Sequence, residues 1–268
     1  MTDLKLALLQ YASQPGDVLG NLQRLDHAAA DAAAAGAQLL VTPEMFLTGY
    51  NIGATQAKVL AEATDGPRAQ AVAAIARQHQ IAIVFGHPEH DAADHIFNTA
   101  QCVDAQGHTL GTYRKTHLFG ALDRSMFSPG AGDEPLFELH GWKLGLLICY
   151  DVEFPENTRR LALQGADLVV VPTANMADFD FVAQHLVPTR AYENQLFVAY
   201  ANFCGREGDL AYGGLSCVAA PDGAGLVQAG RDTELLLADV TQAGLAAGRA
   251  LNEHLAQCRL DGETLSKK

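Results

Sequence analysis

Three segments of the sequence end in side chains that could together carry out covalent catalysis. Cys149 ends the apolar segment LGLLIC, Glu44 ends LLVTPE, and Lys115 ends GTYRK. A thiol can attack a carbonyl carbon, a carboxylate can take the thiol proton, and an ammonium can stabilise the negative oxygen that forms. If the chain brings these segments together, the three residue types indicate acyl chemistry through a thioester.

Each of these residues alone has a simpler interpretation. A cysteine that ends a buried strand is usually a small apolar core residue. Glu44 alone could be a loop acid, and Lys115 alone could be a surface lysine beside Arg114. However, Cys149 lies shortly before Pro155, which suits the first turn of a helix, and a helix N-terminus favours a thiolate. The combination therefore indicates a site where no single residue would.

The segments that carry these residues alternate with helix-like segments, as in α/β proteins. The predicted strands are residues 4–11, 38–44, 81–89, 166–172 and 196–203. The predicted helices are residues 21–35, 67–80, 155–164, 181–195 and a weaker amphipathic helix at 244–259. Hairpins are expected around 105–107 and 140–141, and segments 215–223 and 233–240 are expected as strands around the Asp222-Gly223 turn.

Two α/β arms joined by hairpins predict two sheets packed face to face with helices outside, a four-layer αββα sandwich. Both sheets would be buried on both faces, which explains why LLICY and LVVVP are continuously apolar. The 268 residues are 49% apolar and 18% charged, which suits one large core. We therefore expect a single domain over residues 1–268, with 244–268 as a C-terminal tail.

Composition also limits the partners and the location of the protein. A net charge of −13 argues against nucleic acid, because phosphate binding requires clustered lysine and arginine. No apolar run approaches the roughly 18 residues of a membrane helix, and the N-terminus lacks the apolar stretch of a signal peptide. The five cysteines are widely spaced without a CxxC pair, which predicts reduced thiols and no zinc site. A cytoplasmic location is expected.

Taken together, the three segments resemble the signature segments of the nitrilase superfamily, the carbon–nitrogen hydrolases. They read PEMFLTGYN, YRKTHLF and GLLICYDVEFPE, with spacings of 71 and 34 residues between Glu44, Lys115 and Cys149. The resemblance extends from LALLQ near the start to the PDG turn. It implies the αββα sandwich, a Glu–Lys–Cys catalytic set, no metal or organic cofactor, and a homodimer or larger homo-oligomer.

The superfamily also has a second catalytic glutamate shortly before a Pro-Gly pair. Counting back from Pro129-Gly130 places Asp123 at this position, which is a departure from the family pattern. The resemblance implies that this shorter carboxylate orients Lys115 or the substrate. The alternative is a surface aspartate that pairs with Arg124 or another neighbouring cation.

Within the superfamily, the longest matching segments resemble those of the 5-aminopentanamidases and stereoselective amidases of bacteria. The segments are PEMFLTGYNIG, YRKTHLFG, LDRSMFSPG, LLICYDVEFPEN, VPTANM and YANFCG. This resemblance implies an amidase acting on a small linear aliphatic amide. Candidate substrate contacts within the segments are Tyr50, Phe119, Tyr150, Asn175 and Met176, although an aromatic residue is more often part of a core.

Glu153 gives the choice of substrate a physical basis. Family members that act on dicarboxylic amides carry arginine in CYDxRFPE, where this chain has Glu153. A carboxylate in the pocket repels a substrate carboxylate and attracts an ammonium. We therefore expect an ω-amino amide such as 5-aminopentanamide, hydrolysed to the acid and ammonia. Asp178 and Asp180 are further candidates for this contact, and each of the three could instead be a helix-start or loop carboxylate.

Three alternatives remain open at this point. The first is another reaction of the superfamily, that of an N-carbamoyl-amine hydrolase or a nitrilase. The second is an acyl transferase that passes the thioester to an amine. The third is a catalytically silent binding or scaffold protein, against which the presence of Glu44, Lys115 and Cys149 together speaks.

Overall fold

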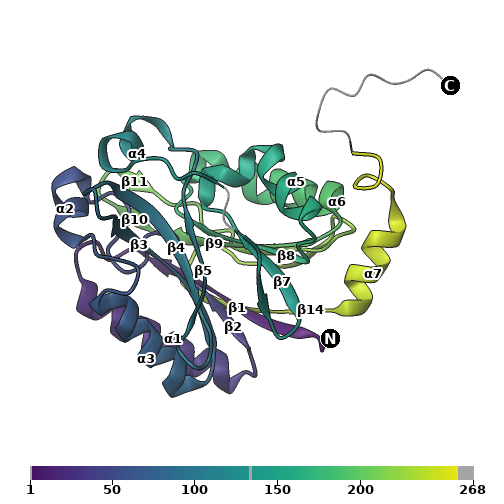
Figure 1. The fold of residues 1–268 in the computed structure, drawn as a ribbon, viewed down its shortest axis with the longest axis horizontal. Coiled ribbons are helices and arrows are strands. Elements are labelled where there is room, and N and C mark those ends of the chain that lie inside the picture. Colours follow the sequence, from purple (N-terminus) through teal and green to yellow (C-terminus); the bar gives the residue numbers. More distant parts are fainter. Residues whose placement is uncertain (1, 133–134, 259–268) are drawn as a thin grey trace.

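Two mixed β-sheets lie face to face between two layers of helices in the computed structural model (Figure 1). The structure describes residues 2–132 and 135–258. The fold is the αββα sandwich that the sequence predicts. Its two sheets come from the two halves of the chain, except that the last strand returns to the first sheet.

The first sheet has the strand order β5–β4–β3–β2–β1–β14. Its strands are β1 (Leu4–Ala12), β2 (Leu39–Val41), β3 (Ala82–His90), β4 (Ile96–Val103), β5 (Thr109–Arg114) and β14 (Glu234–Val240). The three strands β1, β2 and β3 are parallel, and the other pairs are antiparallel. Helices α1 (Val18–Ala34) and α3 (Pro67–His79) cover the outer face (Figure 1). The Asp17 side chain caps α1, and Pro67 begins α3.

The second sheet has the order β6–β7–β8–β9–β12–β13. Its strands are β6 (Phe137–Leu139), β7 (Trp142–Leu146), β8 (Leu168–Thr173), β9 (Phe197–Cys204), β12 (Cys217–Ala219) and β13 (Gly225–Gln228). Helices α5 (Pro155–Leu163) and α6 (Val187–Asn194) cover its outer face (Figure 1). The end of β1 pairs with the end of β9 through Tyr11 and Ala12, so the two sheets form one continuous folded sheet.

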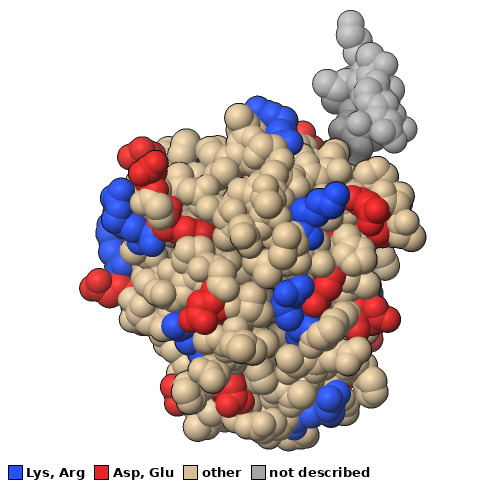
Figure 2. Space-filling model, turned by 90° about the vertical axis from the view of Figure 1, so that its left-hand side faces the viewer, with Lys and Arg blue, Asp and Glu red and all other residues tan. Residues whose placement is uncertain are grey.

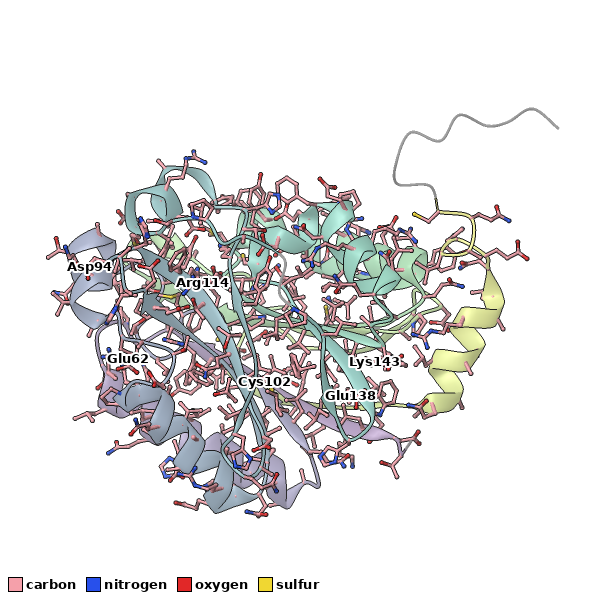
Figure 3. All side chains as sticks on the ribbon, viewed as in Figure 1. Glu62, Asp94, Cys102, Arg114, Glu138 and Lys143 are labelled. Carbon is pink, nitrogen blue, oxygen red and sulfur yellow. The ribbon has the colours of Figure 1, made fainter. Side chains whose placement is uncertain are left out.

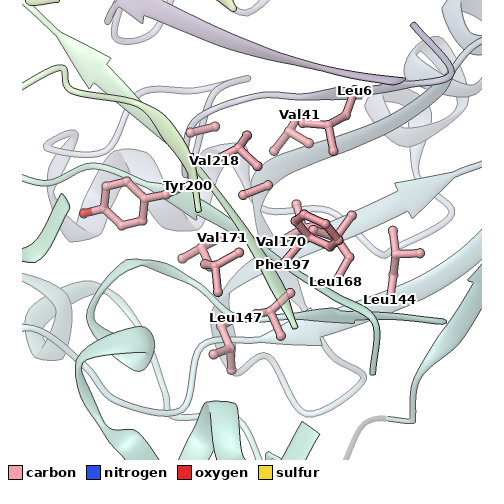
Figure 4. Close-up of a cluster of buried hydrophobic side chains, with 14 of the residues drawn as sticks. Leu6, Val41, Leu144, Leu147, Leu168, Val170, Val171, Phe197, Tyr200 and Val218 are labelled. Atoms are coloured by element: carbon pink, nitrogen blue, oxygen red, sulfur yellow. The ribbon is translucent and has the colours of Figure 1, made fainter. Parts of the chain in front are cut away.

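Apolar side chains from both sheets fill the space between them. In Figure 4, Leu6 and Val41 of the first sheet approach Val170 and Val218 of the second. Every residue of β8 is buried, as expected for a parallel strand covered on both faces. A second buried cluster lies beneath α1 and α3. Such burial stabilises a fold by about 1.5–3 kcal/mol for each large apolar side chain.

Several short elements complete the fold. They are α2 (Gly53–Leu60), α4 (Gly120–Met126), α7 (Gln242–Leu251), the hairpin of β10 (Arg206–Glu207) with β11 (Leu210–Ala211), and one-turn helices at Cys149–Glu153, Ala177–Phe179 and Val182–Leu186. The sequence did not indicate α2, α4 or the β10–β11 hairpin. Helices α2 and α4 lie toward the same end of the molecule in Figure 1.

Two sequence-based assignments were wrong in detail. The strand after the Asp222-Gly223 turn that pairs with β12 is β13, whereas β14 pairs with β1 in the other sheet. The helix expected at 181–195 is confirmed, with a π-helical turn at Val182–Leu186 that continues directly into α6, where Pro188 lacks the N–H of a regular helix. The helix expected at 244–259 ends at Leu251, and residues 259–268 of the expected tail lie outside the described residues.

Within residues 2–132 and 135–258, no helix combines the length and the apolar character needed to cross a bilayer.

Candidate active site

Glu44, Lys115 and Cys149 each follow the end of a strand of the sandwich. Glu44 lies three residues after β2, Lys115 follows β5 directly, and Cys149 lies three residues after β7. Glu44 and Lys115 are completely buried and Cys149 is 8% exposed. The thiol lies close enough to Glu44 and Lys115 for both charges to act on its pKa. The structure therefore brings the three segments together.

The Lys115 ammonium joins two buried carboxylates. Its Nζ atom donates hydrogen bonds to Glu44 Oε1 and to Asp123 Oδ2, both at 2.7 Å. Asp123 lies in α4, is completely buried, and also accepts a hydrogen bond from the N–H of Phe119 at 2.9 Å. The alternative of a surface aspartate paired with Arg124 is therefore wrong. The position of Asp123 suits the orientation of Lys115.

One oxygen of Glu44 is held and the other is free. Oε1 accepts from Lys115 and, at 2.6 Å, from the side-chain amide of Asn98 in β4. Oε2 is buried and finds no hydrogen-bond partner among the described residues. A buried oxygen without a donor is unfavourable at rest, and it is available to accept a proton during a reaction.

Burial and mutual charge set the protonation of this cluster. Burial raises the pKa of Glu44, and the Asp123 charge adds to this effect, whereas Lys115 opposes it. Burial lowers the pKa of Lys115, but the negative groups around it, Glu44 above all, outweigh burial and raise this pKa well above its usual range. Lys115 is therefore a permanent cation, and Glu44 is a carboxyl group tuned toward proton exchange.

The Cys149 thiol is held in its protonated form. Burial raises the pKa of the thiol well above its usual range, Glu44 raises it further, and Lys115 and the N–H of Ala174 only partly oppose this. The expectation that the following helix favours a thiolate was therefore wrong, because burial beside carboxylates outweighs a one-turn helix. A protonated thiol needs a base at the moment of attack, and Glu44 is beside it.

Backbone conformation fixes the two turns that carry Glu44 and Cys149. Cys149 has φ 48° and Met45, which follows Glu44, has φ 54°, both in the left-handed region that non-glycine residues rarely adopt. Gly86 of β3 allows the Glu44 turn to lie against the sheet. A Cβ atom at Gly86 would lie 2.3 Å from the backbone nitrogen of Met45. Sequence reasoning could not identify this contact.

The expected aromatic substrate contacts occupy two different positions. Tyr50 is buried, with its ring centroid 5.6 Å from Lys115 Nζ. Phe119 and Tyr150 are partly exposed and pack edge to face, with centroids 5.4 Å apart. Phe119 makes a similar contact with Phe179 at 5.7 Å. Tyr50 therefore lies beside Lys115, and the rings of Phe119, Tyr150 and Phe179 pack together near Cys149.

Asn175 and Met176 follow β8 beside the Cys149 turn. The Asn175 N–H donates to the side chain of Asn202 at 2.8 Å, and its side-chain amide donates to the carbonyl of Phe179 at 3.2 Å. Met176 is half-buried and pairs through its backbone with Tyr212. These contacts shape the loop beside the sulfur.

The Glu153 carboxylate is half-buried and uncommitted. Burial raises its pKa, while Arg190 and Lys115 act against this rise, so Glu153 lies within electrostatic range of both cations. Among the contacts of the described residues, none engages its carboxylate oxygens. Arg190 is itself paired with Glu193 at 2.9 Å. By contrast, Asp180 forms an ion pair with Arg231, and Asp178 is exposed.

Two further buried carboxylates near the site escaped the sequence analysis. Asp151 accepts hydrogen bonds from residues that flank both Lys115 and Cys149. Glu207 accepts from the backbone N–H groups of Tyr50 and Asn51. The only sequence signal was the place of Asp151 in CYDVEFPE, since acidic residues are usually exposed.

Figure 2 shows the end of the molecule that carries α2 and α4, where acidic and basic side chains are interspersed, so this face has no large patch of a single charge. Arg114, next to Lys115, lies toward this end in Figure 3, while Cys102 is completely buried in the core. Burial raises the pKa of Cys102 and, to about 12, that of Cys217. Both are core thiols.

In the part of the chain that the structure describes, no group of three or more His, Cys, Asp or Glu residues is placed to hold a metal ion. The reactive groups on hand are a thiol, a carboxyl with a free oxygen, and an ammonium.

Comparisons with known proteins show the family of this chain. The family model described as carbon-nitrogen hydrolase matches residues 5–250. A Pseudomonas protegens protein named "Hydrolase in pqqF 5'region" is 54% identical over 256 residues, which cover 96% of this chain and 89% of that protein. An (R)-stereoselective amidase from a Pseudomonas species is 37% identical over 96% of this chain and 92% of its own length.

A solved structure has a similar fold. It is a mutant of the amidase from Nesterenkonia sp. AN1 that shows covalent addition of the acetamide moiety of fluoroacetamide at its active-site cysteine. Its TM-score to this chain is 0.84 at 36% identity, with 96% of this chain and 94% of that chain covered.

Proposed function

Because the chain belongs to the carbon–nitrogen hydrolase family, we propose that it is an amidase that converts a small linear aliphatic amide to the acid and ammonia. The preferred substrate is an ω-amino amide such as 5-aminopentanamide. One observation carries the proposal: Lys115 Nζ contacts Glu44 and Asp123 at 2.7 Å, with the Cys149 thiol within their electrostatic reach. The amidase names of the Pseudomonas and Nesterenkonia relatives support the amide.

In the first half of the reaction, the Cys149 sulfur attacks the amide carbon. The free Oε2 of Glu44 takes the thiol proton as the carbon–sulfur bond forms. The negative oxygen of the tetrahedral intermediate is stabilised by Lys115 and by the N–H of Tyr150, which lies among the unpaired N–H groups at the start of a helical turn. Because the thiol is protonated at rest, proton transfer and attack are coupled.

The protonated Glu44 then gives its proton to the departing nitrogen, and ammonia leaves a thioester on Cys149. A water molecule gives a proton to Glu44 and attacks the thioester carbon. The carbon–sulfur bond breaks, the proton returns to the sulfur, and the acid is released. Asp123 keeps Lys115 in place throughout, which lets the ammonium act without rearrangement.

Glu153 is the basis for the ω-amino preference. It is half-buried, it lies within electrostatic range of Arg190 and Lys115, and no described side chain forms a hydrogen bond or ion pair with its carboxylate. A substrate ammonium would supply the missing partner, whereas a substrate carboxylate would be repelled. Its partial exposure keeps the contribution modest, about tenfold in kcat/KM, equivalent to about 1.4 kcal/mol.

A substrate panel tests the proposal. Ammonia release from pentanamide, 5-aminopentanamide and the half-amide of a dicarboxylic acid is measured for the wild type, Glu153→Gln and Glu153→Arg. We expect the wild type to prefer the amino-terminated amide, Glu153→Gln to lose this preference, and Glu153→Arg to shift it toward the dicarboxylic half-amide. Equal rates for all substrates in all three proteins would contradict the ω-amino preference and leave the amidase reaction standing.

The same assay distinguishes the other reactions of the superfamily. A carbamoylase would release carbon dioxide together with ammonia from an N-carbamoyl amine. A nitrilase would consume the corresponding nitrile, and an acyl transferase would form a new amide when an amine is added. Any of these activities at a higher kcat/KM than amide hydrolysis would replace the proposed reaction.

A further inference from the structure

Asp151, two residues after the nucleophile, is a completely buried carboxylate that the proposed mechanism does not use. Its Oδ1 atom accepts hydrogen bonds from Thr116 Oγ1 and the His117 N–H, both at 2.8 Å, and contacts His117 Nδ1 at 3.0 Å. Its Oδ2 atom accepts from the Tyr113 hydroxyl at 3.0 Å and the Ile148 N–H at 3.2 Å. Both oxygens are therefore fully occupied by donors.

These donors belong to the two catalytic segments. The Ile148 N–H belongs to the residue directly before Cys149, and Thr116 and His117 directly follow Lys115. Asp151 thus connects segments that lie 34 residues apart in the chain through one side chain. No other carboxylate among the described residues joins the flanks of Cys149 and Lys115 in this way.

The conformation of Cys149 shows why such a connection is needed. With φ 48°, Cys149 adopts a left-handed conformation that is strained for a residue with a side chain. Strained backbone persists only where the surrounding structure fixes it. The bond from the Ile148 N–H to Asp151 closes the turn on one side of the cysteine, and the bonds from Thr116 and His117 hold that turn against the lysine segment.

We propose that Asp151 is a positioning residue that sets the distance between the Cys149 sulfur and Lys115. This inference rests on the proposed function. A carboxylate is required at this position, because two of its donors are backbone N–H groups that cannot become acceptors. An asparagine would direct its NH₂ group at the N–H of either Ile148 or His117, whichever oxygen it replaced. One of the two catalytic turns would lose its anchor.

The pKa of His117 provides a measure of its hydrogen bond to Asp151. Its hydrogen bond to Asp151 raises its pKa, and its ring stacks on Phe154 with centroids 3.9 Å apart. Replacement of Asp151 by asparagine should lower the pKa of His117, which can be followed by NMR titration of the ring.

The test compares Asp151→Asn with Asp167→Asn. Asp167 is also a buried aspartate that accepts a backbone N–H, that of Lys143 at 2.9 Å, but it lies at the start of β8, away from Cys149. For each protein we measure kcat, KM, the denaturation midpoint, and the rate of alkylation of Cys149 by iodoacetamide, read from the peptide that contains it.

We expect Asp151→Asn to lower kcat about 10²-fold, as for a misplacement of about 1 Å, with KM little changed and alkylation slowed. Asp167→Asn should lower the denaturation midpoint while retaining the kcat and alkylation rate of the wild type. Thr116→Val removes one donor and keeps both backbone anchors, and it should lower kcat about two- to tenfold. This variant provides the test if Asp151→Asn does not fold.

The inference is overturned if Asp151→Asn retains the kcat and the alkylation rate of the wild type. It is also overturned if Asp151→Asn and Asp167→Asn lose activity alike. Where Asp151→Asn does not fold, a wild-type kcat for Thr116→Val overturns it. A wild type that hydrolyses no amide would instead refute the proposed function. In that case the alkylation rates would still decide whether Asp151 positions the sulfur.

Discussion

Replacement of Lys115 by methionine removes the cation that joins two buried carboxylates. Lys115, Glu44 and Asp123 are all completely buried, and both ion pairs measure 2.7 Å. Methionine has a similar length and fills the same space, so the substitution mainly removes charge. Loss of one partner from a buried ion pair costs about 3–5 kcal/mol. We therefore expect Lys115→Met to lower the free energy of unfolding by about this amount near neutral pH.

The loss should depend on pH in a defined direction. Burial raises the pKa of Glu44, and Lys115 opposes this rise. An acid whose pKa is raised in the folded state loses stability as the pH rises through that pKa. Without Lys115 the pKa of Glu44 rises further, and its protonated form neutralises part of the cluster at low pH. The difference in unfolding free energy between the wild type and Lys115→Met should therefore be largest near about pH 8 and should become smaller toward about pH 5.

Urea unfolding at several pH values measures this deficit for the wild type, Lys115→Met and Lys143→Met. Lys143 is an exposed lysine of β7, far from α4 in Figure 3, so its replacement controls for the loss of a positive charge. The control should change the unfolding midpoint little at any pH. Two outcomes would contradict a buried cluster of carboxylates around the Lys115 ammonium. One is that the unfolding free energies of the wild type and Lys115→Met change with pH in parallel. The other is that Lys115→Met loses as little stability as Lys143→Met.

Three further substitutions test other parts of the site. Gly86→Ala places a Cβ atom 2.3 Å from the backbone nitrogen after Glu44, so we expect about 10²-fold lower kcat, and an active alanine variant would contradict this close approach. Asp123→Asn removes a charge that raises the pKa of Glu44, so the acid limb of kcat/KM against pH should move to lower pH, and a shift to higher pH would contradict the assigned coupling. Glu207→Gln leaves a backbone N–H of the Tyr50 loop unpaired and should lower the free energy of unfolding by about 1–3 kcal/mol, measured by urea unfolding.

The main strands and helices could be predicted because their apolar patterns are long. LVVVP lies in β8, which is buried on both faces of its sheet, and it reads as a continuous apolar run. LLICY was expected to be part of a strand as well, but β7 ends at Leu146 and Cys149 begins a one-turn helix. The seven residues of α4 are too few to show a helical period, so its sequence reads as a loop. The return of β14 to the first sheet is a long-range pairing that a local turn signal cannot reveal.

Three motifs in register predicted that Glu44, Lys115 and Cys149 lie close together. They did not predict the protonation state of the thiol. A helix start after Cys149 suggested a thiolate, whereas burial beside Glu44 keeps the thiol protonated. The role of Asn98 in holding Glu44, and the contacts of Asp151, depend on neighbours far away in the chain. Polar residues in buried strands were the only signal for such partners.

Some expectations stay predictions. They are the homo-oligomer, the cytoplasmic location, the absence of a cofactor, and the single domain over residues 1–268.

The most direct test of the account is to trap the acyl-enzyme. The wild type and Glu44→Gln are mixed with 5-aminopentanamide, quenched in acid and analysed by peptide mass spectrometry, with Cys149→Ala as the control. We expect a 5-aminopentanoyl thioester on the Cys149 peptide of the wild type, none on that of Glu44→Gln, which lacks the base needed for acylation, and no turnover by Cys149→Ala. Turnover by Cys149→Ala at the wild-type rate, or an acyl group on a different residue, would contradict the account.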